Sequence, residues 1–422
     1  IIKIFLKLVK KLKRKLMKLK ILHVVGGSSI NGSFKGACIL HKALEKLNVN
    51  SCILNDTADY NDQLKLENSI KNIKFINKKF INKIMGKFFI ICEKIFKSIL
   101  LHSPRETFTF GILGFDITKT NEYREADIIH IHWISQGFVS LKSLGKINKP
   151  TVWTMRDMWA FTGGAHYEID FKKYENSFVS KIIKNYKFKQ YNKSFYFVAV
   201  SNWLRDKAKE SLILKNKNVY QIDNNVEIEN FEIINKDAAR SFLGIKTTKQ
   251  ILLYGAQNPQ SLRKGWKIFL ETLKLVDKSK YYLLIFGNFW SHEDLNKIGI
   301  EYKSLGFISN SKTLNQVYSS ADIFVASSLE DAWPKTFAEA MYCGIPVVCF
   351  NNTSISEIVN HKLNGYVVDD LNPLSLKNGI DWLSDQVKNN KLDNLKIQNK
   401  ILNYDPSKIA TKYIDFYKKI IK

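Results

Sequence analysis

The chain has 422 residues, too long for one ordinary hydrophobic core and suited to two domains. Hydrophobic residues make up 45% and aromatic residues 13%, a composition that argues against an intrinsically disordered chain. The 65 lysines and arginines outnumber the 39 acidic residues, and the formal net charge of +26 favours nucleic acid, anionic lipid or phosphorylated substrates as partners. The lysine bias of an AT-rich genome explains the same excess equally well.

The five cysteines, at positions 38, 52, 92, 343 and 349, show neither metal-ligand spacing nor the pattern of a disulfide framework. Their use indicates a reducing compartment. Because no run of eighteen apolar residues is free of charge, we expect no transmembrane helix.

Two basic segments have apolar residues at helical spacing, the pattern of a helix that lies on an anionic bilayer. The first is an extension at residues 1–16, which lacks the apolar centre and cleavage site of a signal peptide. Because Met17 directly precedes the first predicted strand, this extension is equally well interpreted as untranslated upstream sequence. The second segment, residues 84–101, is explained about as well by a helix whose apolar face packs in the core.

Strands and helices alternate along the chain, with a polar stretch at residues 213–230. This rhythm predicts two doubly wound parallel sheets, with one domain at residues 17–212 and a second at 213–405. A helix at residues 406–421 has an apolar face that needs a partner surface. The predicted strands are residues 20–25, 127–131, 151–154 and 195–200 in the first half, and 251–254, 281–286, 321–326, 345–350 and 365–368 in the second.

Residues 26–44, GGSSINGSFKGACILHKAL, follow the first strand and form a glycine-rich turn that leads into a helix. Such a turn lets backbone amides approach an anion, but its spacing fits neither a dinucleotide fingerprint nor a Walker loop. An ordinary strand-to-helix turn is therefore the stronger interpretation.

Histidines and charged residues follow two further strands of the first half. His130 and His132 alternate along a strand as core histidines do, and we identify no further ligands that would complete a metal site. Arg156, Asp157 and His166 come after the end of another strand, where a functional and a structural role are about equally well supported.

Charged residues in the second half fall at the carboxyl edge of the second predicted sheet, where ligands of open α/β sheets bind. Arg263 and Lys264 follow a strand and could clamp a diphosphate, although two solvated charges explain them equally well. In SSLEDAWPKTFAEAMYCGIPVVCF, residues 327–350, Asp331 follows a strand and Glu339 lies early in a helix predicted over 335–343.

Five segments, GSFKGACILHKAL, ADIIHIHWISQGF, VWTMRDMWAFTGGAHY, RKG and LEDAWPKTFAEAMYCGIPVV, resemble the retaining GT-B glycosyltransferases of family four. The resemblance is closest to the bacterial branch of colanic-acid and other surface-polysaccharide enzymes. The resemblance runs from about Lys18 to the end. Its most specific part is the family's motif of two acidic residues separated by seven others. It implies two Rossmann-like domains facing a cleft, with the last helix crossing back to the first domain.

The same resemblance implies roles for single residues. The second domain would hold a nucleotide diphosphate sugar, with the donor-binding residues Arg263, Lys264, Lys335, Thr336 and Glu339. The first domain would hold the acceptor, with the cleft residues Gly32, Lys35, Asp157 and His166. The catalytic residues would be Asp331, which faces the transferred sugar, and Arg156.

Three positions depart from the family pattern. Asp331 stands where the motif usually has Glu, which shortens the carboxylate by one methylene. Arg156 stands where relatives have a histidine often assigned a catalytic role, and arginine cannot act as a base. From Ala165 onward the chain lacks the cysteines that many relatives carry.

We therefore predict a cytoplasmic glycosyltransferase, peripheral on the inner face of the plasma membrane, that acts in bacterial surface polysaccharide biosynthesis. It would transfer a sugar with retention to a lipid-linked acceptor, using no metal or other cofactor and no nucleic acid. The first alternative is a nucleotide-sugar epimerase or hydrolase of the same architecture, which would act without an acceptor. The second is a non-enzymatic polyanion-binding protein, which a salt-sensitive gel shift would support.

Overall fold

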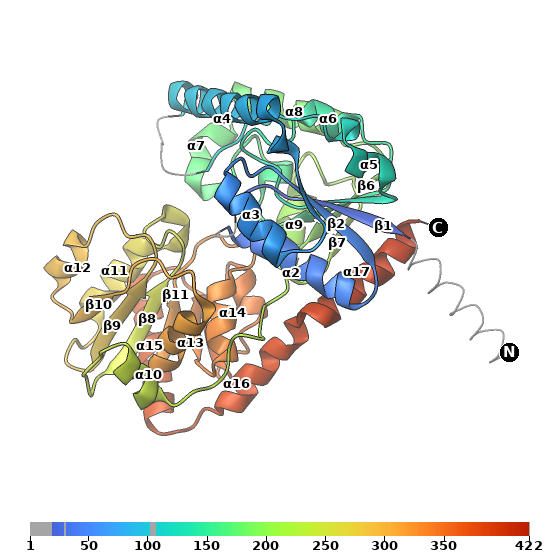
Figure 1. The fold of residues 1–422 in the computed structure, drawn as a ribbon. Helices are drawn as coiled ribbons and strands as arrows, with labels where there is room; N and C mark the ends of the chain where they lie inside the picture. The colour runs from blue at the N-terminus through green and yellow to red at the C-terminus, as the bar shows by residue number, and fades with distance from the viewer. Residues whose placement is uncertain (1–18, 29–30, 102–106, 422) are drawn as a thin grey trace. The chain divides into compact units, whose positions relative to one another are not determined.

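The computed structural model describes residues 19–28, 31–101 and 107–421 (Figure 1). The chain divides into two units, one of Ile1–Asn225 with Pro406–Lys422 and one of Val226–Asp405. The expected extension at residues 1–16 lies outside the described residues. No helix in the described part of the chain is both long enough and apolar enough to cross a bilayer.

The first unit is built on a seven-stranded sheet in the order β3-β2-β1-β4-β5-β6-β7, with every pair of neighbours parallel. The expected strands β1, β4, β5 and β6 are confirmed, whereas β2, β3 and β7 were not predicted. Because β7 joins this sheet, the unit extends beyond residue 212. The strands are β1 (Lys20–Val24), β2 (Asn50–Asn55), β3 (Ile73–Phe75), β4 (Ile128–Ile131), β5 (Thr151–Met155), β6 (Phe195–Ala199) and β7 (Val219–Gln221).

Helices cover both faces of the first sheet, with α2 and α17 on one face and α6 and α8 on the other (Figure 1). Helix α4 agrees with the amphipathic segment expected near residues 84–101, but only three of its residues are buried. Its apolar face is therefore not core. The helices are α2 (Gly32–Lys46), α3 (Tyr60–Ser69), α4 (Phe80–Leu100), α5 (Asn121–Glu125), α6 (Leu141–Gly145), α7 (Lys172–Glu175), α8 (Phe178–Gln190), α9 (Asn202–Glu210) and α17 (Pro406–Ile420).

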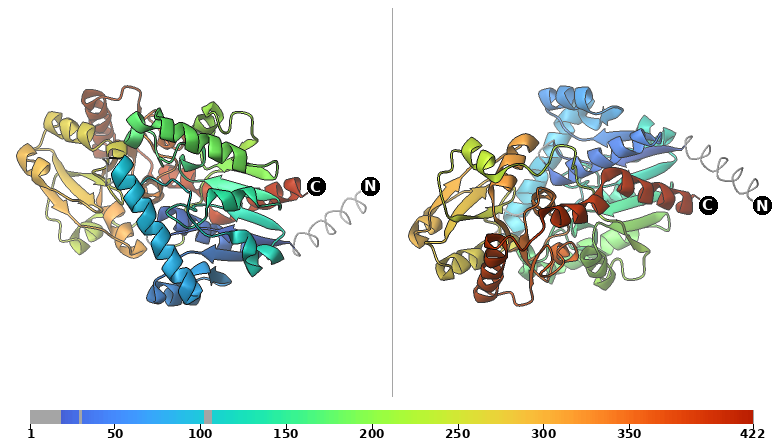
Figure 2. Two further views of the ribbon diagram at one scale, coloured as in Figure 1. Left: turned by 90° about the horizontal axis from the view of Figure 1, so that it is seen from above. Right: turned by 90° about the horizontal axis from the view of Figure 1, so that it is seen from below.

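The last helix, α17, finds its partner surface in the first unit, as expected. Its apolar face packs with α2 and with sheet residues such as Ile21 and Val152, and the view from below shows it in front of the sheet (Figure 2, right). Two buried tyrosines of α17 also make polar contacts: Tyr417 Oη lies 2.6 Å from His130 Nδ1, and Tyr413 Oη lies 2.7 Å from Thr154 Oγ1. The C-terminus of the chain is thereby anchored to β4 and β5.

The second unit is built on a six-stranded parallel sheet in the order β10-β9-β8-β11-β12-β13. Five of its strands were predicted, and the three-residue edge strand β10 was not. The strands are β8 (Gln250–Gly255), β9 (Tyr281–Phe286), β10 (Tyr302–Ser304), β11 (Ile323–Ala326), β12 (Val347–Phe350) and β13 (Gly365–Val368). The helices are α10 (Lys236–Phe242), α11 (Trp266–Leu275), α12 (Glu293–Ile298), α13 (Ser311–Ser320), α14 (Lys335–Tyr342), α15 (Pro373–Lys388) and α16 (Asn394–Ile401).

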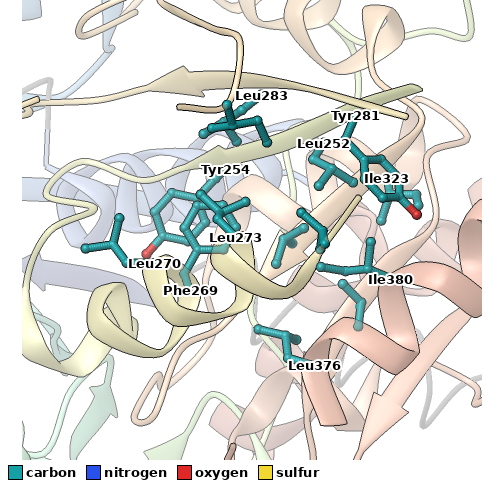
Figure 3. Packing of buried hydrophobic residues seen from close by; sticks show 14 of the residues in the cluster. Leu252, Tyr254, Phe269, Leu270, Leu273, Tyr281, Leu283, Ile323, Leu376 and Ile380 are labelled. Atoms are coloured by element: carbon teal, nitrogen blue, oxygen red, sulfur yellow. The ribbon is translucent and has the colours of Figure 1, made fainter. Parts of the chain in front are cut away.

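The core of the second unit lies between its sheet and helices α11 and α15. Figure 3 shows Leu252 and Leu283 of the sheet above Phe269 of α11 and Ile380 of α15, and all four side chains are fully buried. This packing fixes the sheet and leaves the carboxyl ends of β8 and β11 to the loops that form the site described below.

The contact between Tyr417 and His130 gives a test of how α17 is held. We expect Tyr417→Phe to lower the free energy of unfolding by about 1 to 3 kcal/mol, because His130 Nδ1 loses its partner in the core. Tyr60→Phe is the matched control, since Tyr60 is 64% exposed, and it should change stability by less than about 0.5 kcal/mol. Urea unfolding measures both, and equal effects would contradict the role of this hydrogen bond.

Candidate active site

The site in the second unit lies where the strand order of the sheet reverses. β8 pairs with β9 on one side and with β11 on the other, so the helices that follow β8 and β11 leave toward opposite faces. Such a switch point opens a crevice at the carboxyl ends of the strands. The loop after β8 carries Arg263 and Lys264, and the loop after β11 carries Asp331. The other predicted donor-binding residues lie in α14.

These two loops are tied together by hydrogen bonds to backbone carbonyl groups. Ser327 Oγ donates a hydrogen bond to the Lys264 carbonyl at 2.9 Å, and the Leu329 amide donates to the Arg263 carbonyl at 2.7 Å. Gly265 has a φ of 68°, and a Cβ at this position would lie 1.9 Å from the Ser327 carbonyl oxygen. Only glycine fits this close approach, which brings the loop that presents Arg263 and Lys264 against the loop after β11.

The carboxylate of Asp331 joins both basic residues. Lys264 Nζ forms an ion pair with Asp331 Oδ2, and Arg263 Nη1 lies 3.5 Å from the same oxygen. The other oxygen accepts a hydrogen bond from the Trp333 amide at 3.3 Å. Burial lowers the pKa of Lys264, and the charge of Asp331 opposes this effect. The predicted residues of two loops thus form one partly desolvated charge cluster.

A pocket beside this cluster meets the start of α14. Its lining includes Lys264, Ser327, Ser328, Pro334 and Thr336. The first amides of α14 have no partner within the helix, and the residue before it, Pro334, offers no side-chain cap. Because the positive end of a helix dipole favours an anion, Lys264 and the start of α14 make the pocket suitable for a phosphate group.

Glu339 lies one turn into α14 and is held by a residue that sequence reasoning missed. Tyr318 of α13 is buried, and its hydroxyl donates to Glu339 Oε2 at 2.8 Å. Burial raises the pKa of Tyr318 well above its ordinary value, and the carboxylate of Glu339 adds to the rise. No local pattern in the sequence marks this tyrosine. Lys335, the first residue of α14, is partly exposed.

A second pocket lies in the first unit, after β4 and β5. Its lining includes His132, Ser135, Arg156 and Asp157. Among the described residues, His132 Nδ1, Ser135 Oγ and Arg156 Nε are buried atoms without a hydrogen-bond partner. Three unsatisfied polar atoms around one pocket point to a polar ligand, because buried polar groups are otherwise almost always paired.

Arg156 makes this second pocket cationic. Its Nη1 donates to Asn224 Oδ1 at 2.5 Å, and the guanidinium lies against Gly36, where an added Cβ would be 2.4 Å from Nη1. Within the described part of the chain no carboxylate forms an ion pair with it. Burial lowers the pKa of Arg156. The side chain is therefore a partly desolvated cation suited to an anionic ligand.

Asp157 and His166 are brought together as a pair. Asp157 Oδ2 lies 2.6 Å from His166 Nδ1, and His166 Nε2 lies 3.2 Å from Thr109 Oγ1. Lys187 of α8, which was not among the residues predicted from the sequence, binds the carbonyl oxygens of Trp159 and Thr162. It thereby fixes the loop between Asp157 and His166. Burial lowers the pKa of Lys187 to about 7. Both ring nitrogens of His166 are engaged in holding this loop.

The remaining candidates of the first unit lie around α2. Gly32 is exposed and Lys35 partly exposed in its first turn. The Gly27 amide, in the glycine-rich turn considered as an anion site, donates to Asp56 Oδ1 at 2.9 Å. Burial raises the pKa of Asp56 to about 6. This amide is therefore occupied by a carboxylate of the chain itself, a contact that no sequence pattern indicated.

A buried histidine cluster joins the second pocket to the core. One ring nitrogen from each of His23, His130 and His132 lies within 4.8 Å of the others, the one potential metal-ligand group among the described residues. His130 Nδ1 and Nε2 are hydrogen-bonded to Tyr417 and Thr154, which confirms its predicted structural role. Burial lowers the pKa of all three histidines well below the ordinary value.

Two protein families match parts of this chain. Residues 235–400 match the family described as Glycosyl transferases group 1, and residues 94–230 match the family described as Glycosyltransferase Family 4. The chain is 26% identical to an uncharacterized glycosyltransferase of Methanocaldococcus jannaschii over 288 residues, covering 64% of this chain and 67% of the relative. It is 25% identical to an uncharacterized 41.2 kDa protein in the cps region of Klebsiella pneumoniae over 285 residues, covering 65% and 74%.

The fold is shared with solved structures of low sequence identity. One is the Anabaena protein Alr3699/HepE in complex with UDP-glucose, with a TM-score of 0.64 at 15% identity, covering 95% of this chain and 100% of that chain. The two parallel-sheet α/β units are those of the GT-B fold, as expected from the sequence.

The fit of Gly265 against the neighbouring loop can be tested with a matched glycine. Gly299 has a φ of 72° but no atom within 4 Å of an added Cβ, so Gly299→Ala should cost only about 1 kcal/mol of backbone strain. Gly265→Ala adds the clash with Ser327 and should lower the free energy of unfolding by roughly 2 kcal/mol more. Equal losses in urea unfolding would show that the two loops are not held together as described.

Proposed function

We propose that this chain, a GT-B glycosyltransferase with a family 4 domain followed by a group 1 domain, transfers a sugar from a nucleotide diphosphate sugar to a lipid-linked glycan acceptor with retention. The observation that carries the proposal is the charge cluster of Lys264, Arg263 and Asp331 beside the start of α14. The bound UDP-glucose of the Anabaena protein supports a nucleotide sugar as the donor.

In this proposal the donor diphosphate replaces Asp331 as the partner of Lys264 and Arg263. The leaving diphosphate gains negative charge during transfer, and fixed positive groups lower the barrier when they are already aimed at it. Thr336 lines the same pocket, and α14 adds the positive end of its dipole. Protein groups therefore supply the positive charge, and we propose that no metal is required.

The two carboxylates then have separate tasks. Asp331, released from the basic pair, would face hydroxyl groups of the transferred sugar. Glu339, which Tyr318 orients through a 2.8 Å hydrogen bond, would accept hydrogen bonds from the ribose of the nucleotide. A carboxylate accepts two such bonds at once, which suits the paired hydroxyls of a ribose.

The acceptor would bind in the first unit, at the pocket of His132, Ser135 and Arg156. Arg156 cannot take a proton from the acceptor, so its proposed role is to stabilise negative charge. The Klebsiella relative is encoded in a cps region, which supports a role in surface polysaccharide biosynthesis at the cytoplasmic face of the plasma membrane. A thermal-shift screen of nucleotide sugars would identify the donor.

The donor site predicts a separation of binding effects. Arg263→Ala with Lys264→Ala should weaken nucleoside diphosphate binding by about 100-fold or more, because two charge-assisted contacts are lost. Glu339→Gln should weaken binding of the nucleoside and leave free pyrophosphate unaffected. Calorimetric titration measures each affinity.

Because the double alanine variant leaves Asp331 buried without its cations, the control adds Asp331→Asn to the same two substitutions. This triple variant removes the unpaired carboxylate and should show the same loss of diphosphate affinity. Unchanged affinity in a folded triple variant would overturn the assignment of the donor site.

Arg156 can be tested by varying its charge and its shape separately. Arg156→Lys keeps the cation and should retain most of the turnover with a lipid-linked acceptor, whereas Arg156→Gln should lower turnover about 10- to 100-fold. Nucleoside diphosphate affinity should stay unchanged in both variants. A rise in turnover for Arg156→His would show that the position is a damaged catalytic site, and the electrostatic role would fail.

A further inference from the structure

Helix α4 presents an unusually apolar outer surface. Eleven of its large hydrophobic side chains are exposed, among them Phe80 at 76%, Ile84 at 52% and Ile91 at 54%. The helix spans 21 residues, about 30 Å at the usual rise per residue. An apolar stripe of this length is costly to leave in water, so a partner surface is expected to cover it.

The opposite side of α4 attaches the helix to the first unit through few contacts. Its buried residues are Gly86, Phe89 and Glu93, which share one side of the helix at spacings of three and four. The Phe89 ring packs against Phe115 with ring centroids 5.4 Å apart. The Glu93 carboxylate accepts hydrogen bonds from the amides of Phe110 at 2.8 Å and Gly111 at 2.9 Å. These contacts fix which side of α4 points outward.

The charges of α4 indicate which kind of surface the helix would bind. Lys83, Lys87 and Lys94 follow one another at spacings of four and seven, so they form a row along one border of the apolar face. The single acidic residue of the helix is Glu93, which is buried and held by amides. Apart from Ser98, the exposed residues of α4 are therefore apolar or cationic.

We propose that α4 lies flat on an anionic bilayer, with its apolar face among the acyl chains and its lysine row at the phosphates. The helix is too charged to span the bilayer, and this combination of faces is that of an interfacial helix. Association of two copies through α4 is disfavoured, because it would bring the lysine rows together without an exposed acid on either helix. The inference does not depend on the proposed reaction.

Helix α8 extends the same outer side of the unit. Figures 1 and 2 (left) both show α4 and α8 on this side, and Leu101, directly after α4, shares a hydrophobic cluster with Ile183 of α8. Phe178 and Ile182 of α8 are 76% and 50% exposed. A bilayer is broad enough to contact both helices, whereas a groove in a protein partner fits one helix.

The test compares three paired glutamine variants of the full chain in flotation with vesicles of phosphatidylcholine, with and without 30% phosphatidylglycerol as a chosen probe composition. Lys87→Gln with Lys94→Gln should weaken binding to the anionic vesicles by roughly 30-fold. Ile91→Gln with Ile95→Gln should weaken it by about 100-fold, since both side chains leave the acyl region. The control, Leu371→Gln with Leu395→Gln, removes two exposed apolar residues of the second unit and should bind as the original chain does.

Each variant alters only exposed positions, so unfolding midpoints should remain unchanged. Binding to the anionic vesicles that is equal in all four proteins would overturn the assignment of α4. The assignment would also be overturned if the original chain were a dimer that binds no vesicles and the α4 variants were monomers. The apolar face would then bind a second copy of the chain. Undiminished binding to the anionic vesicles after the lysine substitutions would overturn the role of the lysine row.

Discussion

The carboxylate of Asp331 is the contact on which the second unit's site depends. Lys264 and Asp331 are 11% and 6% exposed, and a lone charge at either position would be costly. Sharing the carboxylate between Lys264 and Arg263 holds three charges at the switch point of the sheet. The same loops are joined by the Ser327 and Leu329 hydrogen bonds, so backbone geometry and electrostatics specify one arrangement. A diphosphate that enters the pocket meets positive groups already in place.

The buried charge of the first unit has a different kind of partner. Arg156 is paired with the amide oxygen of Asn224, and among the residues described no acid forms an ion pair with it. The three histidines beneath it are kept neutral by burial, and α17 closes over them with Tyr413 and Tyr417. This unit thus holds a desolvated cation at its pocket, whereas the second unit holds two cations that share one carboxylate. The difference fits an acceptor contact in one unit and a displaceable counter-ion in the other.

Much of the fold and part of the site could be predicted from the sequence, because they depend on patterns within short segments. The two parallel sheets followed from buried strands alternating with helices, and the GT-B fold was implied by the resemblance of five motifs to a known family. The meeting of Lys264 with Asp331 followed from placing both at the carboxyl edge of one parallel sheet. Contacts between distant segments left no local signal, as with Tyr318 and Glu339 or Asp56 and Gly27. Short edge strands such as β3, β7 and β10 contain too few residues to show an alternating pattern of apolar and polar side chains. For α4, the pattern indicated an apolar face, and only the structure shows that this face is exposed.

The most direct test of the account asks whether Asp331 and the donor diphosphate compete for Lys264. Nucleoside diphosphate affinity would be measured by calorimetry in Asp331→Asn, in Lys264→Met and in the double variant, which together form a double-mutant cycle. The account predicts that Asp331→Asn tightens binding several-fold when Lys264 is present. The same substitution should change binding little when residue 264 is methionine, because the carboxylate then has no ammonium group for which to compete with the diphosphate. Binding that weakens by the same factor in both backgrounds would contradict it.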